Sequence, residues 1–319
     1  MVTLDDIRAA DGRIRSIARR TPLVDASASA GRPLWLKCEN QQPGGAFKIR
    51  GATNMIMQLS DADRRRGVIT YSSGNHGQAV ALAASRLGTT SVVVVPTTAP
   101  DVKIAGVRRW GGEVIHAGTT SIDRLERAKA VAESRGLAMV PPFDHEWIIA
   151  GQGTCGLEIL DQLAEVQIVA VPVGGGGLSS GVSTAIKLMR PDVTVIGVEP
   201  EGAAKMSTSL AAGHPVTLPS TDSIADGLIT VRPGEITFEH VKRHVDRVIT
   251  VSDKEIAAAT LWLFAEAKQV VEPSGAATVA AAMADRYADV FGRDRKIVAI
   301  LSGGNVSLET LASLAKLTS

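Results

Sequence analysis

Residues 168–179 read Ile-Val-Ala-Val-Pro-Val-Gly-Gly-Gly-Gly-Leu-Ser, an apolar run followed by four glycines and the start of a helical pattern. A short run of branched apolar residues is typical of a strand that is buried on both faces. The glycines break this strand and lead into a helix predicted over residues 178–189. Such a strand–loop–helix unit is typical of an open α/β sheet, in which ligands bind where the strands end.

The same alternation of strand and helix recurs on both sides of this unit. The predicted strands are short and apolar, at residues 34–37, 68–71, 91–95, 113–116, 168–173, 194–198 and 296–301. Between them lie the predicted helices, at residues 4–19, 49–59, 78–87, 103–110, 122–134, 152–163, 178–189, 253–268, 275–287 and 306–316. We therefore predict an α/β fold with two open, mainly parallel, twisted sheets covered by helices. A small domain over residues 52–143 is expected to be inserted in a large domain over residues 1–51 and 144–319.

Composition and charge exclude several classes of protein. The 319 residues carry 34 Lys and Arg against 33 Asp and Glu, a formal charge of +1, so no nucleic-acid partner is expected. No apolar run approaches the roughly 20 residues that a membrane helix needs, and residues 1–20 lack an apolar signal core. Two cysteines, Cys38 and Cys155, are too few for a disulfide framework or a thiolate metal site, and Cys155 is expected in the core. We expect a soluble, cytoplasmic protein that binds a small molecule.

Lys48 lies within Lys-Cys-Glu-Asn-Gln-Gln-Pro-Gly-Gly-Ala-Phe-Lys-Ile-Arg-Gly at residues 37–51, where a Pro-Gly-Gly turn enters the predicted helix. A helix N-terminus favours anions, so a lysine at this place is unusual. A depressed pKa there would suit a Schiff-base lysine. On this segment alone, a solvated lysine in the first helical turn explains the residue equally well.

Three loops rich in small and polar residues follow predicted strands and open predicted helices. They are Ser-Ser-Gly-Asn-His-Gly at 72–77, Gly-Gly-Gly-Gly-Leu-Ser at 174–179 and Ser-Gly-Gly-Asn at 302–305. Backbone amides at helix N-termini bind anions, and four glycines allow a phosphate to approach the backbone closely. The second loop lacks the Gly-Lys-Ser/Thr of a Walker loop. With Ser179 in place of the third glycine and Glu199 downstream, it nearly satisfies the dinucleotide fingerprint, so a nicotinamide enzyme is a rival on this segment. That rival does not explain Lys48 or the third loop.

Lys48 within Phe-Lys-Ile-Arg-Gly and the three loops in this order closely resemble the fold-type II pyridoxal-phosphate enzymes. The resemblance is to the serine/threonine dehydratase (threonine ammonia-lyase) and serine racemase group, and it covers roughly residues 4–316. It implies a tryptophan synthase β-like fold, pyridoxal 5'-phosphate as the cofactor and a homodimer. The large domain would bind the cofactor, and the small domain would carry the loop for the substrate carboxylate.

The resemblance also implies roles for individual residues. Lys48 would hold the cofactor as an imine and then act as the base, and Ser73 would be an acid/base on the opposite face. Cofactor contacts are implied for Phe47, Lys48, Asn75, Gly174, Gly175, Gly176, Gly177, Leu178, Gly227, Ser302 and Gly303. Contacts with the substrate are implied for Ser72, Ser73, Gly74, Asn75 and His76. A neutral Ser302 hydroxyl at the pyridine nitrogen would leave a weaker electron sink, which favours prompt β-elimination over transamination.

The implied reaction is α,β-elimination from L-threonine or L-serine, which gives a 2-oxo acid and ammonia. Return of a proton by Ser73 would give racemisation instead, so an amino-acid racemase is the near alternative. Dehydration of 3-hydroxyaspartate or phenylserine also stays open. A cofactor-carrying protein without activity would be expected to lack Lys48 or Asn75, and both are present. The chain ends directly after the last predicted helix, so no appended regulatory domain is expected.

Two further motifs could bind metal ions. Residues 199–205, Glu-Pro-Glu-Gly-Ala-Ala-Lys, resemble a divalent-metal segment of racemase-like members, with Lys205 where an aspartate is expected. The ammonium would repel a metal and could pair with Glu199, so we predict no tightly bound divalent ion and no other metal. His240 and His244 have the spacing of a helical metal pair. Lysine and arginine residues surround them, so we predict a solvated basic helix face.

Overall fold

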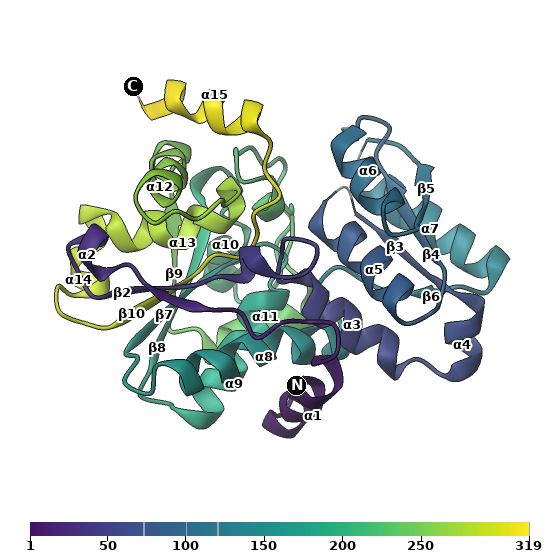
Figure 1. Ribbon diagram of the computed structural model, residues 1–319, viewed down its shortest axis with the longest axis horizontal. Helices are drawn as coiled ribbons and strands as arrows, with labels where there is room; N and C mark the ends of the chain where they lie inside the picture. Colours follow the sequence, from purple (N-terminus) through teal and green to yellow (C-terminus); the bar gives the residue numbers. More distant parts are fainter. Residues whose placement is uncertain (73, 100, 120, 319) are drawn as a thin grey trace.

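The computed structural model describes residues 1–72, 74–99, 101–119 and 121–318, and it contains two α/β units that lie side by side (Figure 1). The larger unit is built on a six-stranded sheet with the order β1-β2-β10-β7-β8-β9, and the smaller unit on a four-stranded sheet with the order β5-β4-β3-β6. Only the β1–β2 pair among them is antiparallel. The predicted α/β fold with two mainly parallel sheets is confirmed.

The strands of the large sheet are β1 Leu23–Asp25, β2 Leu34–Lys37, β7 Ile168–Pro172, β8 Thr194–Pro200, β9 Arg247–Val251 and β10 Ile297–Ile300. Those of the small sheet are β3 Val68–Tyr71, β4 Ser91–Val95, β5 Glu113–His116 and β6 Ala138–Met139. The helices up to β7 are α1 Leu4–Ile14, α2 Ser27–Ala30, α3 Lys48–Gln58, α4 Asp61–Arg66, α5 Asn75–Arg86, α6 Asp101–Arg108, α7 Ser121–Arg135 and α8 Glu146–Gln162. Those after β7 are α9 Gly177–Met189, α10 Lys205–Ala212, α11 Glu235–His244, α12 Asp253–Ala265, α13 Pro273–Met283, α14 Ala288–Phe291 and α15 Leu308–Thr318.

Both faces of the large sheet are covered by helices. Val169 and Val171 of the central strand β7 pack with residues of α8 and α9 on one face. Ile168 and Ala170 point the other way and pack with residues of α12 and α13. Because both sets of alternating side chains are buried, the strand reads as a continuous apolar run rather than as an alternation.

The small sheet is likewise buried between helices. Val93 and Val95 of β4 pack with Val107 of α6 and with α5 on one face. Val92 and Val94 pack with α7 on the other. Helix α3 joins the two units, since it packs against α8 of the larger unit and α5 of the smaller one. The polypeptide crosses between the units at α3 and again before α8, and the proposed division at residues 51/52 falls inside α3.

Some predicted elements differ from the observed ones. Helix α1 ends at Ile14 rather than at residue 19, and a turn follows. Helix α8 begins at Glu146, six positions before the predicted start at residue 152, because His145 accepts a hydrogen bond from the Trp147 amide and caps the helix. Strands β1, β6 and β9 and helix α10 lie in stretches that were not assigned to an element. Among the described helices, none combines the length and apolar character required to cross a bilayer.

The predicted solvated face at His240 and His244 is wrong. Both side chains are buried, and His240 accepts a hydrogen bond from the Val2 amide at 3.2 Å and meets the Thr184 hydroxyl at 3.0 Å. Burial lowers the pKa of His240 to about 4, so the ring is neutral at physiological pH. The exposed Lys242 side chain lies on the opposite face of α11, and the sequence alone did not reveal which face packs against α9.

Candidate active site

Lys48 is the first residue of α3, as the turn before it predicts. Gly44 and Gly45 adopt φ values of 80° and 77°, which residues with a Cβ rarely adopt. These two glycines form the turn that leads into the helix. The Lys48 ammonium donates a hydrogen bond to the carbonyl oxygen of Pro142 at 2.7 Å. Burial lowers the pKa of Lys48 to about 8, because the charged form is poorly solvated there. A substantial fraction of this amine is therefore neutral near physiological pH.

The loop after β10 lies against the segment that carries Lys48. The Phe47 amide donates to the Ser302 carbonyl at 3.0 Å, and Ala46 and Gly303 form a β-bridge. The Ser302 side chain is buried, and its hydroxyl lies 3.5 Å from the Ser274 carbonyl oxygen. The third loop and Lys48 are thus held together by backbone hydrogen bonds.

The glycine loop after β7 leads into the N-terminus of α9. Gly176 is the N-cap residue, with φ of 101°, and a Cβ there would lie 2.7 Å from the Cβ of Thr237. A Cβ on Gly175 would lie 2.4 Å from the Phe143 ring. The first amides of a helix have no acceptor within the helix, so those of α9 are available to an anion. Because these contacts are close, a side chain on Gly175 or Gly176 would displace the loop and the amides that it presents.

Gly227 joins the glycine loop to the third loop. Its amide donates to the Ser274 hydroxyl at 2.8 Å, and its carbonyl oxygen would lie 2.9 Å from a Cβ on Gly174. The Ser274 carbonyl also lies beside the Ser302 hydroxyl. The glycine loop, Gly227 and the third loop therefore converge at the carboxyl ends of the strands of the large sheet. The order β10-β7-β8 places the ends of their strands next to one another.

The crossover before α8 contributes residues that the sequence analysis missed. Pro142 accepts the hydrogen bond from Lys48, and Phe143 packs against Gly175 and Gly177. The Asp144 carboxylate accepts hydrogen bonds from three backbone amides at the start of α11, at 2.9 to 3.0 Å. The only local signal is the Pro-Pro-Phe-Asp run, which reads as an ordinary turn.

The loop after β3 reaches across to the larger unit. Asn75, the first residue of α5, donates through its side-chain amide to the Glu272 carboxylate at 2.5 Å. Its side-chain oxygen accepts a hydrogen bond from Asn305 at 2.9 Å. Asn75 therefore lies where the two units meet, and Glu272 is a further residue that sequence reasoning missed. In the same loop the Ser72 hydroxyl accepts from the Gly74 amide at 3.2 Å. Ser73 lies outside the described residues.

His76 is buried behind this loop. Its Nε2 lies 3.1 Å from the Val140 carbonyl oxygen, which can only accept a hydrogen bond, so Nε2 carries the hydrogen. Burial, helped by the nearby Lys48 ammonium, lowers the pKa of His76 to about 3. The ring is therefore neutral and is not a proton donor to substrate at physiological pH.

Lys205 pairs with Glu199, as predicted. Both side chains are fully buried, and the ammonium lies 3.4 Å from a Glu199 carboxylate oxygen. Glu199 also accepts hydrogen bonds from the amides of Met206 and Ser207 at 3.0 and 2.8 Å. A carboxylate held in this way cannot bind a ribose, which removes the acidic residue that the nicotinamide rival needs.

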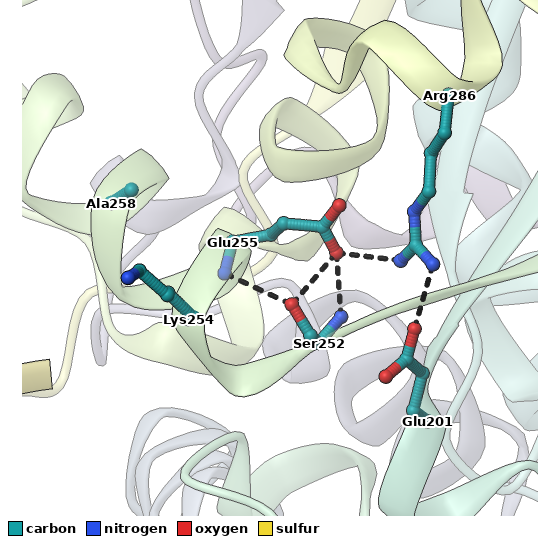
Figure 2. A pocket seen from close by; sticks show the side chains of 6 residues that line it. All are labelled: Glu201, Ser252, Lys254, Glu255, Ala258 and Arg286. Carbon is teal, nitrogen blue, oxygen red and sulfur yellow. Dashed lines mark hydrogen bonds and ion pairs between the residues drawn. The ribbon is translucent and has the colours of Figure 1, made fainter. Parts of the chain in front are cut away.

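A hollow of about 540 Å³ is lined by residues that belong to none of these loops (Figure 2). It is lined by Glu201, Ser252, Lys254, Glu255, Ala258 and Arg286. The Arg286 guanidinium lies between the carboxylates of Glu201 and Glu255, at 2.8 and 2.6 Å, so its charge is already paired. None of the predicted site residues lines this hollow. We therefore do not assign the candidate site to it.

The sequence profile described as pyridoxal-phosphate dependent enzyme matches residues 14–303 of the chain. The chain is 43% identical, over 98% of its length and 77% of the relative, to an L-threonine ammonia-lyase from Thermotoga maritima. It is 42% identical, over 97% of its length and 92% of the relative, to a serine racemase from Oryza sativa subsp. indica. The structure of maize serine racemase superposes with a TM-score of 0.94 at 41% identity, covering 99% of this chain and 97% of the other.

Proposed function

The chain belongs to the family of pyridoxal-phosphate dependent enzymes, and on that premise we propose that it is an ammonia-lyase for L-threonine or L-serine. The products would be a 2-oxo acid and ammonia, formed by α,β-elimination. The observation that carries the proposal is the buried Lys48 amine, whose pKa is lowered to about 8. Its segment is bonded to the Ser302 loop, and it donates to Pro142, whose neighbour Phe143 packs against the glycine loop. Relatives named threonine ammonia-lyase or threonine deaminase, at 43 and 40% identity, support this reaction.

The residues present fit pyridoxal phosphate. The Lys48 nitrogen would hold the group covalently, and the amides at the start of α9 would bind its phosphate. A Cβ on Gly175 or Gly176 would clash with Phe143 or Thr237, so glycine at both positions keeps the loop and its amides in this place. The buried Ser302 hydroxyl would face the ring nitrogen. When bound, pyridoxal phosphate supplies an electron sink for the charge that develops at the substrate α-carbon.

Lys48 would also act as the general base. The neutral amine would take the proton from the substrate α-carbon, and the Pro142 carbonyl would orient the resulting ammonium. The neutral Ser302 hydroxyl cannot hold a ring nitrogen protonated as a carboxylate would. We infer that charge at the α-carbon is short-lived, which favours immediate departure of the β-hydroxyl over transamination.

We propose that the loop at residues 72–76 binds the substrate carboxylate at the N-terminus of α5, where backbone amides and the helix dipole favour an anion. Asn75 would face the phenolic oxygen of the cofactor from the same loop. His76 would contribute through its backbone, because its ring is turned toward Val140. A homodimer and a cytoplasmic location are further proposals that rest on the family resemblance.

The test is an absorbance spectrum of the purified protein, followed by addition of L-threonine and L-serine with an assay for 2-oxo acid. A yellow protein whose absorbance band shifts with substrate, and which releases 2-oxo acid, would support the ammonia-lyase and rank the two substrates. A yellow protein that releases no 2-oxo acid from either would overturn it. Bulkier β-hydroxy amino acids such as 3-hydroxyaspartate and phenylserine would then be assayed.

A second candidate function is serine racemase. It is favoured by the rice and maize relatives, which are as similar to this chain as the ammonia-lyases are. In this reading Ser73 returns a proton to the opposite face of the α-carbon. Ser73→Ala would then abolish formation of D-serine while sparing much of the 2-oxo acid release. An equal fall in both would assign Ser73 to substrate binding instead.

A further inference from the structure

Lys205 is a fully buried lysine at the start of α10, outside the loops described above. Its ammonium lies 2.6 Å from the carbonyl oxygen of Val173 and 2.8 Å from that of Leu228. The carboxylate of Glu199 forms an ion pair with the same ammonium, at 3.4 Å. The Lys205 ammonium therefore donates two hydrogen bonds to backbone carbonyls and has its countercharge beside it.

The two carbonyls belong to segments of the candidate active site. Val173 directly precedes the glycine loop, and Leu228 directly follows Gly227. The segments already touch, since a Cβ on Gly174 would lie 2.9 Å from the Gly227 carbonyl oxygen. Two carbonyl dipoles that point their negative ends at one place repel each other unless a cation lies between them. Lys205 supplies that cation.

The cation is fixed in place by Glu199. This carboxylate comes from β8 and is held by the amides of Met206 and Ser207 at the start of α10. It neutralises the buried ammonium and leaves Lys205 a single position between the two loops. Glu199 of β8 and Lys205 of α10 thus form an ion pair that is shielded from solvent.

We propose that Lys205 is a positioning residue for the cofactor. Its ammonium holds the glycine loop and Gly227 at the separation at which the loop amides bind the phosphate. The inference rests on the assignment of the glycine loop to the phosphate in the proposed function, but not on the choice of substrate. It predicts that loss of the ammonium weakens cofactor binding even where the fold is intact.

The main test variant is Lys205→Met with Glu199→Gln, which removes both buried charges while it keeps the side-chain volumes. This double variant avoids an unpaired buried carboxylate, which would endanger folding. Apoprotein is titrated with pyridoxal phosphate, and the absorbance band of the lysine-bound cofactor gives the dissociation constant. We expect an affinity roughly tenfold lower than that of the wild type, the order of effect of a lost hydrogen bond to a charged group.

Lys37→Met is the matched control. Lys37 is also fully buried, and its ammonium contacts Glu158, Gln162 and the Thr21 carbonyl, away from the glycine loop. Its loss is expected to lower the melting temperature while the affinity for pyridoxal phosphate stays within about twofold of the wild type. A role in stability alone would weaken cofactor binding by Lys37→Met and the Lys205 variant to the same degree.

Chemical rescue identifies the ammonium as the agent. Lys205→Ala is used for this test only as folded protein, with a circular dichroism spectrum that matches the wild type. Ethylammonium added to it is expected to restore most of the lost cofactor affinity, whereas the same salt leaves the wild type unchanged. The proposal is overturned if the double variant binds pyridoxal phosphate as the wild type does, if Lys37→Met weakens binding equally, or if ethylammonium has no effect. Since the readout uses no substrate, failure of the ammonia-lyase assay would not alter it.

Discussion

The side-chain amide of Asn75 lies 2.5 Å from the carboxylate of Glu272, across the boundary between the two α/β units. Asn75 begins α5 of the smaller unit, and Glu272 is the N-cap residue of α13 in the larger one. Residues 197 positions apart in the sequence are thereby held in contact. This hydrogen bond fixes the loop after β3 relative to the loops that surround Lys48. Its loss should therefore change the position of that loop in the candidate active site.

Asn75→Asp should weaken the association of the two units. It places a second carboxylate beside Glu272. Repulsion between the two carboxylates raises their pKa values in the folded protein above those in the unfolded chain. The folded protein then binds more protons than the unfolded chain, so the stability penalty grows as pH rises above about 4. Melting temperatures of variant and wild type, compared across pH, measure this. Asn75→Ala removes the donor without adding charge, and an identical pH dependence in that variant would contradict the explanation.

Lys48→Ala should abolish both the absorbance band of the lysine-bound cofactor and the release of 2-oxo acid. Loss of a general base alone lowers rates by about 10²- to 10⁴-fold, and loss of the covalent attachment adds to this. Lys254→Ala, in the hollow of Figure 2, is the control and should retain the band and the rate. Turnover by Lys48→Ala comparable to that of the control would exclude Lys48 as the base.

The turnover number should rise with pH toward a plateau. Burial lowers the pKa of Lys48 to about 8, and the base is its neutral form, so activity is low below this pH and full above it. An ordinary lysine would move the same rise to about pH 10.4. Initial rates at saturating substrate, measured across this range, locate the midpoint. A profile that is flat through pH 8 would rule out rate control by titration of Lys48.

Gly176→Ala should weaken pyridoxal phosphate binding by more than its effect on stability explains. The residue has φ of 101°, and a Cβ would lie 2.7 Å from the Thr237 Cβ, so the loop must move. Gly213→Ala is the matched control, because Gly213 has φ of 80° with no atom within 4 Å of the added Cβ. Each variant incurs backbone strain of about 1–3 kcal/mol. Only Gly176→Ala should change the cofactor dissociation constant, and equal dissociation constants for the two variants would speak against the glycine loop as the phosphate site.

Arg50→Leu should destabilise the fold strongly. The buried guanidinium bonds to Glu39 and Glu158, each at 2.7 Å, and Arg50 lies in the first turn of α3. Removal of one partner leaves buried carboxylates uncompensated, which costs roughly 3–5 kcal/mol of unfolding free energy. Chemical denaturation measures the loss. Arg15→Leu, which breaks the exposed pair with Asp11, should have little effect. A similar loss in both variants would show that burial of the charges is not the cause.

Much of the fold could be predicted from local patterns. Strands β2, β3, β4 and β5 begin and end at the residues predicted for them. The short edge strands β1 and β6 were missed, because two or three residues carry no periodicity. The buried face of α11 could not be predicted either. This helix has charged residues on one side and two histidines on the other, a pattern that predicts a solvated helix. Only the tertiary structure shows that α9 packs against the histidine side.

The candidate site divides in the same way. The glycine loop, the Ser302 loop and the loop at residues 72–77 each stand out because they place small residues and free backbone amides at strand ends, where an anion can bind. Pro142, Phe143, Asp144 and Glu272 carry no such pattern. Their places depend on which backbone atoms lie opposite them, and that information is absent from any single segment.

By itself, the sequence determined the alternation of strands and helices, the start of α3 at Lys48, the loops at the strand ends and the family. These features are local, because turn chemistry and hydrophobic periodicity act over a few residues. The tertiary structure alone decided the partners: Pro142 for Lys48, 94 positions away, and the two carbonyls for Lys205. The physical reason is the order of strands in the large sheet. That order brings together strand ends that are distant in the sequence. The buried ammonium groups of Lys48 and Lys205 can then donate hydrogen bonds to carbonyl oxygens of other segments.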